Sequence, residues 1–216
     1  MSEYQRTVTL AITGASGVQY AMRLMEVMVA QGVQILVMVS KAAQVVIATE
    51  TDLKLPGGGS AQQAYLSALY NAKAGQIIVF GKEQWMAPVA SGSGSPHTMI
   101  VCPCSTGSLS AIATGASNNL IERAADVVLK ERKQLILVPR EAPYSQIHLE
   151  HMLKLTQMGV VILPASPGFY HKPQTISDLI DFVVARILSQ IGLEQNLLKR
   201  WGSEYLKTPV TTVEGS

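Results

Sequence analysis

The sequence predicts an α/β fold: a single doubly wound parallel sheet, of the Rossmann-like or flavodoxin-like three-layer kind. Short runs that are apolar on both faces recur along the chain, as parallel strands covered by helices must be. Stretches with helical periodicity separate these runs, so right-handed crossovers join the strands. A chain of 216 residues with 48% hydrophobic content can form one packed core. We therefore expect one domain over residues 1–207 and a disordered tail at 208–216.

Each element can be assigned in order. The segments with the composition of buried strands are Thr7–Thr13, Val33–Ser40, Thr98–Cys102, Gln134–Val138 and Val160–Leu163. The segments with helical periodicity are Val18–Ala30, Lys41–Thr49, Ala61–Ala72, Ser105–Thr114, Leu120–Glu131, Ser145–Met158 and Ile176–Ile191. Residues 55–60 and 87–96 are rich in glycine, serine and proline and fit neither pattern, so we expect loops there. The second loop is either a mobile ligand loop or a connector.

Charge is scarce in this sequence. Charged residues make up 15% of the chain, against about 25% in an average soluble protein. A surface with few charges suits a chain that packs against other copies of itself, so we expect a homo-oligomer. The net charge of +2, without a run of lysine and arginine, argues against a nucleic-acid partner. No apolar run approaches the roughly 20 residues that span a bilayer, and no signal peptide is visible, so we expect a cytoplasmic protein without a membrane partner.

Neither the cysteines nor the histidines suggest a metal site. Cys102 and Cys104 flank Pro103, where a disulfide would be strained and further ligands are missing. Buried thiols explain them better. His148 and His151 are three residues apart on a predicted helix, but no third ligand accompanies them. We expect no metal.

Small and polar residues follow the first predicted strand. Gly14, Ala15, Ser16 and Gly17 open directly into a helix. Glycine lets a backbone approach a ligand, and free amides at a helix N-terminus suit a phosphate. The spacing differs from the GxGxxG dinucleotide motif, and no acid follows the second strand to bind a ribose. A mononucleotide phosphate fits better, although simple turn chemistry also produces such a sequence.

The other predicted strands also end in polar residues. The second ends at Ser40, the fourth runs into Arg140 and Glu141, and the fifth into residues 164–170. The third is followed by Ser105, Thr106, Gly107 and Ser108. A helix N-cap needs only one such hydroxyl. Because ligands bind at the carboxyl ends of parallel strands, the convergence favours a ligand site.

Two cations share one predicted helix. Arg123 and Lys130 are seven residues apart and therefore lie on the same helical face. With Arg140 and Glu141 they suggest a preformed anion site with a carboxylate beside it, although a surface salt bridge explains Arg123 equally well. Arg186, the lone charge in an apolar helical stretch, either extends to solvent or binds an anion.

Four further residues are less informative from pattern alone. Glu50 has the position of a solvated acid at a helix end. Tyr170, Trp85 and Trp201 are of types found more often in cores or interfaces than in catalysis. Trp85 stands beside the glycine-rich loop.

Several longer motifs point to one known family. They are GASG at 14–17, SKAA at 40–43, ETD at 50–52, CPCSTG at 102–107, RAADVVLKER at 123–132, VPREAP at 138–143 and PGFYHKPQ at 167–174. Together they resemble the UbiX family of flavin prenyltransferases, over about residues 7–201. The combination of RAADVVLKER with VPREAP is the most specific part.

The resemblance implies prenyl transfer to a flavin. Members of the family bind reduced FMN and join a dimethylallyl group from dimethylallyl monophosphate to flavin N5 and C6. The product, prenylated FMN, serves a UbiD-type decarboxylase. Members form dodecamers built from trimers, with the flavin at subunit interfaces, and need no metal. The chain has no DDxxD-like acidic cluster, so protein cations must replace magnesium, which favours a monophosphate donor.

The resemblance also assigns roles to residues. FMN would contact Gly14, Ala15, Ser16, Ser40, Ser105, Thr106, Gly107, Ser108 and Arg140. The prenyl phosphate would lie among Arg123, Lys130, Glu141, Tyr170 and Arg186. The catalytic set would be Ser16, Glu50, Lys130 and Glu141. In that set Glu141 donates a proton to the departing phosphate and Ser16 relays one near N5. Trp85 and Trp201 would shelter the allylic cation.

Two other functions stay open. One is an FMN-dependent decarboxylase of the cysteine-decarboxylase flavoprotein family, which shares the fold. Its catalytic histidine and lid cysteine have no counterpart here, since no histidine precedes His97 and no cysteine follows Cys104. The other is a non-catalytic flavin-binding protein. The preference between mono- and diphosphate donors, and the pathway served, are open as well.

Overall fold

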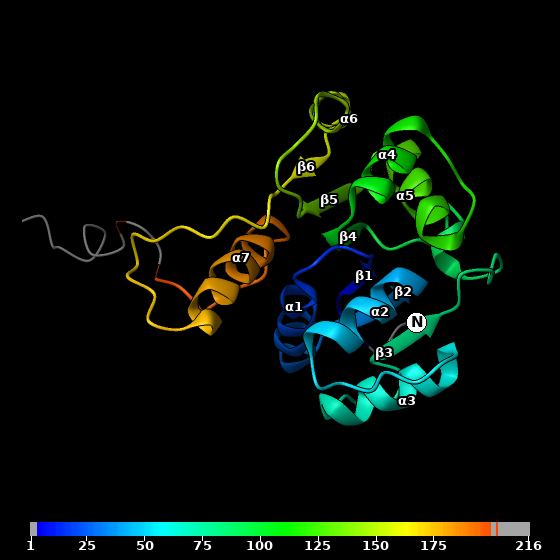
Figure 1. The fold of residues 1–216 in the computed structure, drawn as a ribbon. Helices are drawn as coiled ribbons and strands as arrows, with labels where there is room; N and C mark the ends of the chain where they lie inside the picture. Colours follow the sequence, from blue (N-terminus) through cyan, green and yellow to red (C-terminus); the bar gives the residue numbers. More distant parts are fainter. Residues whose placement is uncertain (1–3, 200–201, 203–216) are drawn as a thin grey trace, which may run out of the picture.

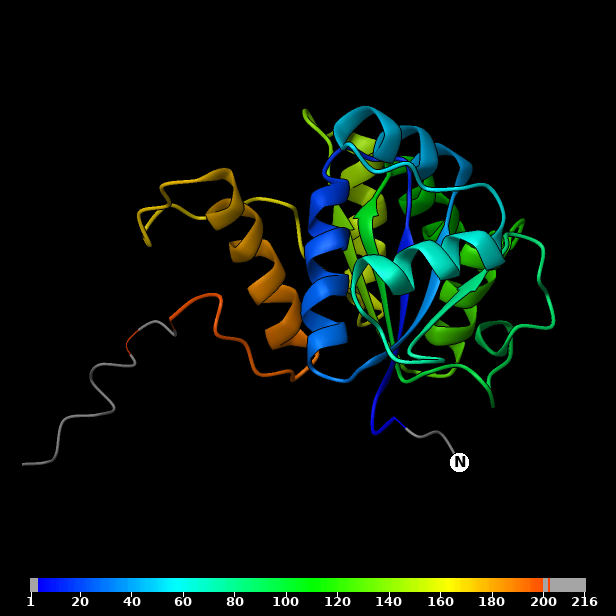
Figure 2. The same cartoon turned by 90° about the horizontal axis from the view of Figure 1, so that it is seen from below.

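The computed structural model describes residues 4–199 and 202, and they form a parallel sheet between two layers of helices, as Figure 1 and Figure 2 show from two sides. The six strands lie in the order β3-β2-β1-β4-β5-β6. Their bounds are Thr7–Ile12 (β1), Gln34–Val39 (β2), Ile77–Phe80 (β3), Thr98–Cys104 (β4), Gln134–Pro139 (β5) and Val161–Ile162 (β6). Each neighbouring pair is parallel, which confirms the predicted fold class.

The helices divide between the two faces of this sheet. Their bounds are Val18–Ala30 (α1), Lys41–Glu50 (α2), Gly59–Leu69 (α3), Thr106–Thr114 (α4), Leu120–Lys130 (α5), Gln146–Gln157 (α6) and Ile176–Gln190 (α7), with a 3-10 turn at Pro88–Ala90 (η1). The first three helices and α7 contribute to one hydrophobic cluster, and α4, α5 and α6 contribute to the other. The chain therefore winds along one face from β1 to β3 and along the other from β4 to β6.

The central strand β1 connects the two clusters. Leu10 and Ile12 belong to the cluster that contains α1 and α7, whereas Ala11 belongs to the opposite one. This alternation follows from the two-residue period of a strand. All three side chains are fully buried, and each buried Leu or Ile contributes roughly 1.5–3 kcal/mol. The apolar runs predicted for the strands are thus explained by burial on both faces.

The last helix packs against the first. Arg23 of α1 makes a bidentate ion pair with Asp181 of α7, with N–O distances of 2.7 and 3.2 Å. At the end of α7, the guanidinium of Arg6 donates to the carbonyls of Ile191 and Gly192. A cation at a helix C-terminus is favourable because the last carbonyls carry partial negative charge. The two ends of the domain are therefore joined.

One strand was not predicted. Ile77–Phe80 forms β3 at the edge of the sheet, and a run of four residues is too short for its periodicity to identify it. The helix predicted at Ala61–Ala72 begins at Gly59, so the predicted loop at 55–60 is shorter than expected. The other predicted strands and helices agree with the structure apart from their end residues.

The cysteines are buried free thiols, as predicted. Cys102 and Cys104 lie in β4 and are inaccessible to solvent. Burial raises the pKa of Cys104 to about 12 and also raises that of Cys102. Both thiols are therefore protonated and unreactive near neutral pH.

Some predictions cannot be compared with the structure. Trp201 and the predicted tail at 208–216 lie outside the described residues. Within residues 4–199 and 202, no helix is long and apolar enough to cross a membrane. The same part of the chain contains no group of three histidine, cysteine, aspartate or glutamate side chains that could hold a metal ion.

Candidate functional site

The strand order reverses between β1 and β4, which lie side by side. Ligands of such sheets bind outside the carboxyl ends of the strands at this switch point. Thr13, which follows β1 and is 2% exposed, connects the two strand ends. Its Oγ1 donates to the carbonyl of Pro103 and accepts from the amide of Ser105, both at 2.8 Å. Thr13 was not predicted as a site residue. Its hydroxyl at the end of the first predicted strand could have indicated such a role.

The N-terminus of α1 binds a carboxylate from the protein itself. Glu50 Oε2 accepts hydrogen bonds from the amides of Gly17, at 2.9 Å, and Val18, at 3.4 Å. The side chain of Gln19 donates to the carbonyl of Glu50 at 3.2 Å. The backbone amides that we expected to bind a phosphate are therefore already hydrogen-bonded to Glu50. Glu50 is a fixed part of the site rather than a solvated acid at a helix end.

The surroundings of Glu50 favour its ionised form. Burial acts to raise the pKa of this carboxyl group. The Ser16 hydroxyl, the two backbone amides and the charge of Arg140 act in the opposite direction and lower the pKa below its usual value. Ser16 follows β1 and Arg140 follows β5, so the fold brings two predicted site residues to the carboxylate of a third, Glu50.

Gly14 is required for packing. A Cβ at Gly14 would lie 2.4 Å from the Cβ of Ala42, so α2 reaches the turn after β1 only because residue 14 has no side chain. Gly17 has a φ of 98°, in the left-handed region that favours glycine. Ser40 caps α2, and its Oγ accepts from the amide of Ala43 at 3.0 Å. Helix packing and capping thus explain two residues that were predicted to contact a flavin.

The N-terminus of α4 is more open. Ser105 Oγ accepts from the amide of Ser108 at 3.2 Å, and the two hydroxyls lie 3.1 Å apart. The amides of Thr106 and Gly107 have no hydrogen-bond partner among the described residues. A Cβ at Gly107 would meet only the Ser105 hydroxyl, 4.0 Å away. Unpaired amides, hydroxyls and free space are what an anion needs at a helix N-terminus.

Arg140 has a buried donor without an acceptor. No described residue accepts a hydrogen bond from its Nε, which is inaccessible to solvent. Such a group is costly to leave unpaired, so it indicates an acceptor that the described residues do not supply. A flavin mononucleotide offers acceptors in its phosphate and its ring carbonyls. Arg140 and the α4 N-terminus therefore fit the cofactor that the sequence predicts.

Glu141 and Tyr144 follow Arg140 at the same end of the sheet. Glu141 is partly exposed, and its Oε1 accepts from the amide of Ala142 at 3.0 Å. Burial raises the pKa of Tyr144, and the charge of Glu141 raises it further. Tyr144 is therefore close to Glu141 and was not predicted as a site residue. Its position directly after the VPREAP motif could have indicated that it belongs to the site.

The loop at 87–96 is attached to α5 and the residues after it. Arg123 Nε donates to the carbonyl of Ala90 at 3.2 Å. Lys133 Nζ donates to the carbonyl and to the hydroxyl of Ser95, both at 2.7 Å. These contacts support the connector interpretation of this loop over the mobile one. They also give Arg123 a contact with the loop that the sequence did not indicate, in addition to a salt bridge with Asp126 of the kind that it did.

Lys130, one of the two predicted cations of α5, lies far from Glu141 within one chain. Arg123 pairs with Asp126 at 2.8 Å, and Lys130 pairs with Glu131. Lys130 is the last residue of α5, which leads to the amino end of β5, whereas Glu141 follows the carboxyl end. The six residues of β5 span about 20 Å at about 3.3 Å each. A single chain does not bring Lys130 beside Glu141.

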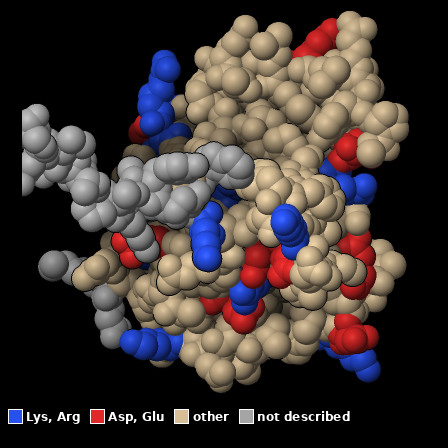
Figure 3. Space-filling view, turned by 90° about the vertical axis from the view of Figure 1, so that its left-hand side faces the viewer, with Lys and Arg blue, Asp and Glu red and all other residues tan. Residues whose placement is uncertain are grey.

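Tyr170 and Arg186 line a common cavity of about 1050 Å³ beside α7. Both side chains are exposed, Tyr170 to 62%. Figure 3 shows this side of the molecule, where basic and acidic side chains lie close together below a larger uncharged area. Trp85 is 45% exposed and lies in the segment after β3. The fold thus brings together two of the residues predicted to bind the prenyl phosphate.

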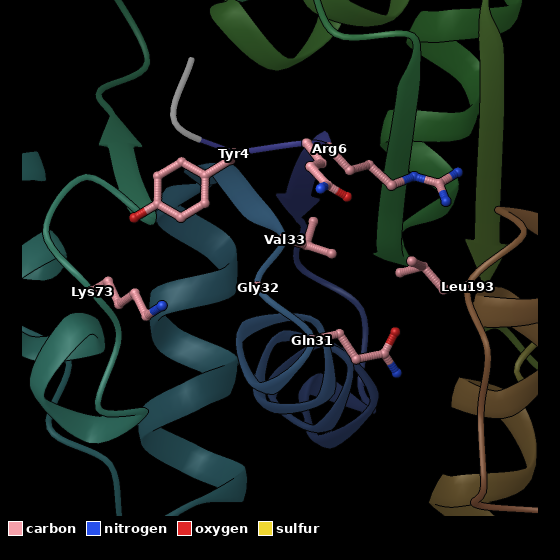
Figure 4. A pocket seen from close by; sticks show the side chains of 8 residues that line it. Tyr4, Arg6, Gln31, Gly32, Val33, Lys73 and Leu193 are labelled. Atoms are coloured by element: carbon pink, nitrogen blue, oxygen red, sulfur yellow. The ribbon is translucent and has the colours of Figure 1, made fainter.

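Another cavity, of about 690 Å³, lies at the amino end of the sheet (Figure 4). Arg6 and Lys73 line it from different sides. Arg6 is engaged with the end of α7, and the hydroxyl of Tyr4 donates to the carbonyl of Ala74 at 2.8 Å. This cavity is opposite the switch point and contains none of the predicted site residues.

Comparisons with known proteins identify the family of this chain. The family model described as Flavoprotein matches residues 1–188. Among curated proteins, the chain is 61% identical to flavin prenyltransferase UbiX of Pseudomonas aeruginosa, covering 92% of this chain and 95% of that one. It is 46% identical to flavin prenyltransferase UbiX of Halalkalibacterium halodurans, covering 94% and 97%.

Solved structures with the same fold include two at 38% identity. One is AnUbiX (PadA1) in complex with FMN and dimethylallyl pyrophosphate, with a TM-score of 0.80 over 91% of this chain and 97% of that one. Another is a dodecameric FMN-dependent UbiX-like decarboxylase from Escherichia coli O157:H7, with a TM-score of 0.80 over 90% and 98%. A PPC decarboxylase complexed with pantothenoylaminoethenethiol is 15% identical, with a TM-score of 0.55 over 76% and 82%, which shows a shared fold alone.

Proposed function

Because this chain belongs to the Flavoprotein family and, within it, to the flavin prenyltransferases, we propose that it joins a dimethylallyl group to N5 and C6 of reduced FMN. The observation that carries the proposal is the buried Nε of Arg140, which lacks an acceptor among residues 4–199. It lies near Glu50 and Ser16 at the switch point, where the fold binds ligands.

The FMN phosphate has its best site at the N-terminus of α4. The amides of Thr106 and Gly107 can donate to its oxygens, as can the hydroxyls of Ser105 and Ser108. Arg140 supplies a charged donor from the neighbouring strand end. When bound, reduced FMN supplies the ring atoms that accept the prenyl group. The residues around it have to orient those atoms and exclude water.

The residues near Arg140 can handle protons. Ser16 lies close enough to Glu50 to help lower the pKa of that carboxyl group, and its hydroxyl can pass a proton near the flavin. Glu141 is free of a cationic partner among the described ion pairs and can donate a proton to a departing phosphate. Tyr170 and Arg186 can stabilise the negative charge that develops on that phosphate. Trp85 offers an aromatic face to an allylic cation.

A neighbouring copy would have to complete this site. Within one chain, Lys130 is separated from Glu141 by the length of β5. Its predicted role beside the phosphate therefore requires a second subunit. The outer surface of α6 carries Leu149 and Leu153, which are more than half exposed and four residues apart. Apolar patches of this kind are typical of interfaces, so we propose a dodecamer.

The donor and the recipient of the product complete the proposal. Dimethylallyl monophosphate is the prenyl donor, because protein cations alone neutralise less charge than a diphosphate carries. The prenylated FMN is a cofactor for a UbiD-type decarboxylase. The reaction takes place in the cytoplasm and needs no metal.

Anaerobic incubation tests this function. The protein is mixed with reduced FMN and either dimethylallyl monophosphate or the diphosphate, with and without a chelator. Mass spectrometry of the extracted flavin should show a gain of one five-carbon unit with the monophosphate, at the same rate in chelator. An unchanged flavin mass with both donors would contradict prenyl transfer.

Glu141→Gln tests the proton donor. The amide keeps the size of the side chain and cannot donate a carboxylic proton, so transfer should slow by about 100-fold or more. FMN binding should not change. Glu83→Gln is the matched control, since Glu83 is an exposed acid that pairs only with Lys82 among the described residues. Equal rates in both variants would exclude Glu141 as the proton donor.

A decarboxylase of the cysteine type is the second candidate. The same incubation with a peptidyl-cysteine substrate and oxidised FMN would detect it as a loss of CO₂ from the peptide. Retention of FMN without either reaction would favour a non-catalytic flavin-binding protein.

A further inference from the structure

His171 has buried ring nitrogens without hydrogen-bond partners, and its side chain lies near the carboxylate of Asp178. Neither Nδ1 nor Nε2 is accessible to solvent, and neither is hydrogen-bonded to a described residue. The imidazole stacks on Phe182, with centroids 5.4 Å apart and planes at 18°. The ring of Tyr170 meets both of them edge-on, at 6.0 and 5.7 Å. A phenyl ring could fill the same place without burying polar atoms, so packing alone does not explain an imidazole here.

The backbone presents His171 in a defined turn. The amide of Lys172 donates to the carbonyl of Phe169 at 2.9 Å, which makes Tyr170 and His171 the central residues of a β-turn. Lys172 has a φ of 56°, a left-handed conformation that is uncommon for a residue with a side chain. A Cβ at Gly168 would lie 3.0 Å from the ring of Tyr170. The turn therefore depends on a strained residue and on a close contact, as functional segments often do.

The cavity beside this turn suits an anion. Of the acids of α7 that line it, Asp181 is held in its ion pair with α1, and Asp178 accepts two backbone amides at 2.8 and 2.9 Å. Arg186 and Lys172 line the same cavity, and neither forms an ion pair with a described residue. Glu194, a third acid, is exposed to solvent. The cations of this cavity are thus more available than its acids.

We propose that His171 is a further phosphate-binding residue, whose ring N–H donates to the phosphate of the prenyl donor beside Tyr170 and Arg186. This inference rests on the proposed function, which places that phosphate in this cavity. Phe182 and Arg186 are four residues apart and lie on the same face of α7. The ring stack and the guanidinium therefore flank the same space. Because both nitrogens are buried, the imidazole must flip about its Cβ–Cγ bond within the stack, so that one nitrogen finds its acceptor in the phosphate.

The variant His171→Phe separates this role from packing. Phenylalanine keeps the stack on Phe182 and the contact with Tyr170 but has no N–H. Binding of dimethylallyl monophosphate and of inorganic phosphate is measured by calorimetry on the FMN-loaded protein. Both should bind about tenfold more weakly, with FMN affinity unchanged, because a hydrogen bond to a charged group is lost. Wild-type phosphate affinity in His171→Phe would overturn the proposal.

Matched variants give the controls. His151 on α6 also has a buried Nδ1 without a described partner, and it does not line the cavity. His151→Phe should therefore leave phosphate binding unchanged. His171→Gln places an amide N–H near the position of Nε2 and should recover most of the affinity; failure to recover any of it would contradict the donor role.

A spectroscopic measurement covers the case in which His171→Phe does not fold. The ¹⁵N resonances of the His171 imidazole in the wild-type protein should move when inorganic phosphate is added. Resonances that stay in place at saturating phosphate would overturn the proposal.

The outcomes also separate this role from the function on which it rests. If the wild-type protein leaves FMN unchanged but its phosphate affinity depends on His171, the phosphate-binding role of His171 is supported and the proposed prenyl transfer is contradicted. If prenyl transfer occurs and His171→Phe binds the donor as tightly as the wild type, the reaction stands and the role of His171 fails.

Discussion

The N-termini of α1 and α4 lie at the same end of the sheet, next to each other, and the protein uses them differently. At α1 the carboxylate of Glu50 occupies the first amides. At α4 a hydroxyl caps one amide, and the amides of Thr106 and Gly107 are unpaired among the described residues. Both sites offer the partial positive charge of a helix N-terminus. Only one of them is available to an anion from outside.

The difference shows how a glycine-rich turn can be misleading. The turn after β1 has the residue types of a phosphate site, but its glycines serve the approach of α2 and the start of α1. The turn after β4 has a single glycine, and a side chain there would extend into open space. The position of the carboxylate, rather than the number of glycines, decides which helix end can bind a phosphate.

We expect the largest effect from Thr13→Val, which removes the hydroxyl that connects the ends of β1 and β4. The hydroxyl is buried and serves both the Pro103 carbonyl and the Ser105 amide. Valine leaves the Ser105 amide unpaired and leaves the carbonyl with only the backbone amide of residue 13, at 3.3 Å. We expect a loss of about 3 kcal/mol in unfolding free energy, measured by urea denaturation. Thr13→Ser keeps the hydroxyl and should lose less than about 1 kcal/mol. Equal stability of the two variants would show that the connection is unimportant.

Gly14→Ala tests the packing role of the turn after β1. The added methyl would lie 2.4 Å from the Cβ of Ala42, so α2 must shift, at a cost of about 2 kcal/mol. Adding Ala42→Gly removes the clash, and the double variant should be more stable than Gly14→Ala alone, despite the poorer helix propensity of glycine. If the second change brings only further loss, contact with Ala42 is not what requires Gly14.

Glu50→Gln removes the internal anion from α1. Because the pKa of Glu50 is lowered in the folded protein, its charge stabilises the fold above about pH 4.5, and that contribution is lost as the pH falls through the folded pKa. Near neutral pH the variant should be about 1 kcal/mol less stable, as for other lost helix caps. Denaturation curves of the two proteins should converge as the pH is lowered. A difference that stays constant with pH would contradict the ionised carboxylate.

Gly107→Ala should change stability least and binding most. The new Cβ has free space and a helical conformation, so unfolding free energy should change by less than about 1 kcal/mol. If the FMN phosphate lies at this helix end, the methyl group occupies its position, and FMN affinity should fall about tenfold or more in a fluorescence titration. Thr114→Ala, at the other end of α4, is the control. Unchanged FMN affinity in Gly107→Ala would place the phosphate elsewhere.

The sequence predicted the fold well because the parallel strands are buried on both faces. Burial makes each strand an apolar run, and helical periodicity separates the runs, so strand and helix positions follow from local pattern. The edge strand Ile77–Phe80 was not predicted because four residues are too few to show a periodic pattern. The family-level function followed from long motifs, above all those at 123–132 and 138–143.

The arrangement of the site was less predictable, because it depends on contacts between residues distant in sequence. Glu50 reaches an amide 33 residues earlier in the chain, and Thr13 contacts a carbonyl 90 residues later. No local pattern indicates such partners. Arg123 illustrates the same limit: its spacing from Lys130 was visible, but its bond to the carbonyl of Ala90 was not.

The packing of α7 on α1 also bears on how the chain is made. Arg23 finds Asp181 158 residues later, and Arg6 reaches the carbonyl of Ile191 185 residues later. During synthesis, β1 and α1 leave the ribosome long before the helix that covers them. Until then, the apolar side chains of this cluster that pack against α7 are exposed. The nascent chain therefore depends on its last helix to bury its first, and a ribosome stalled before α7 should hold an aggregation-prone protein.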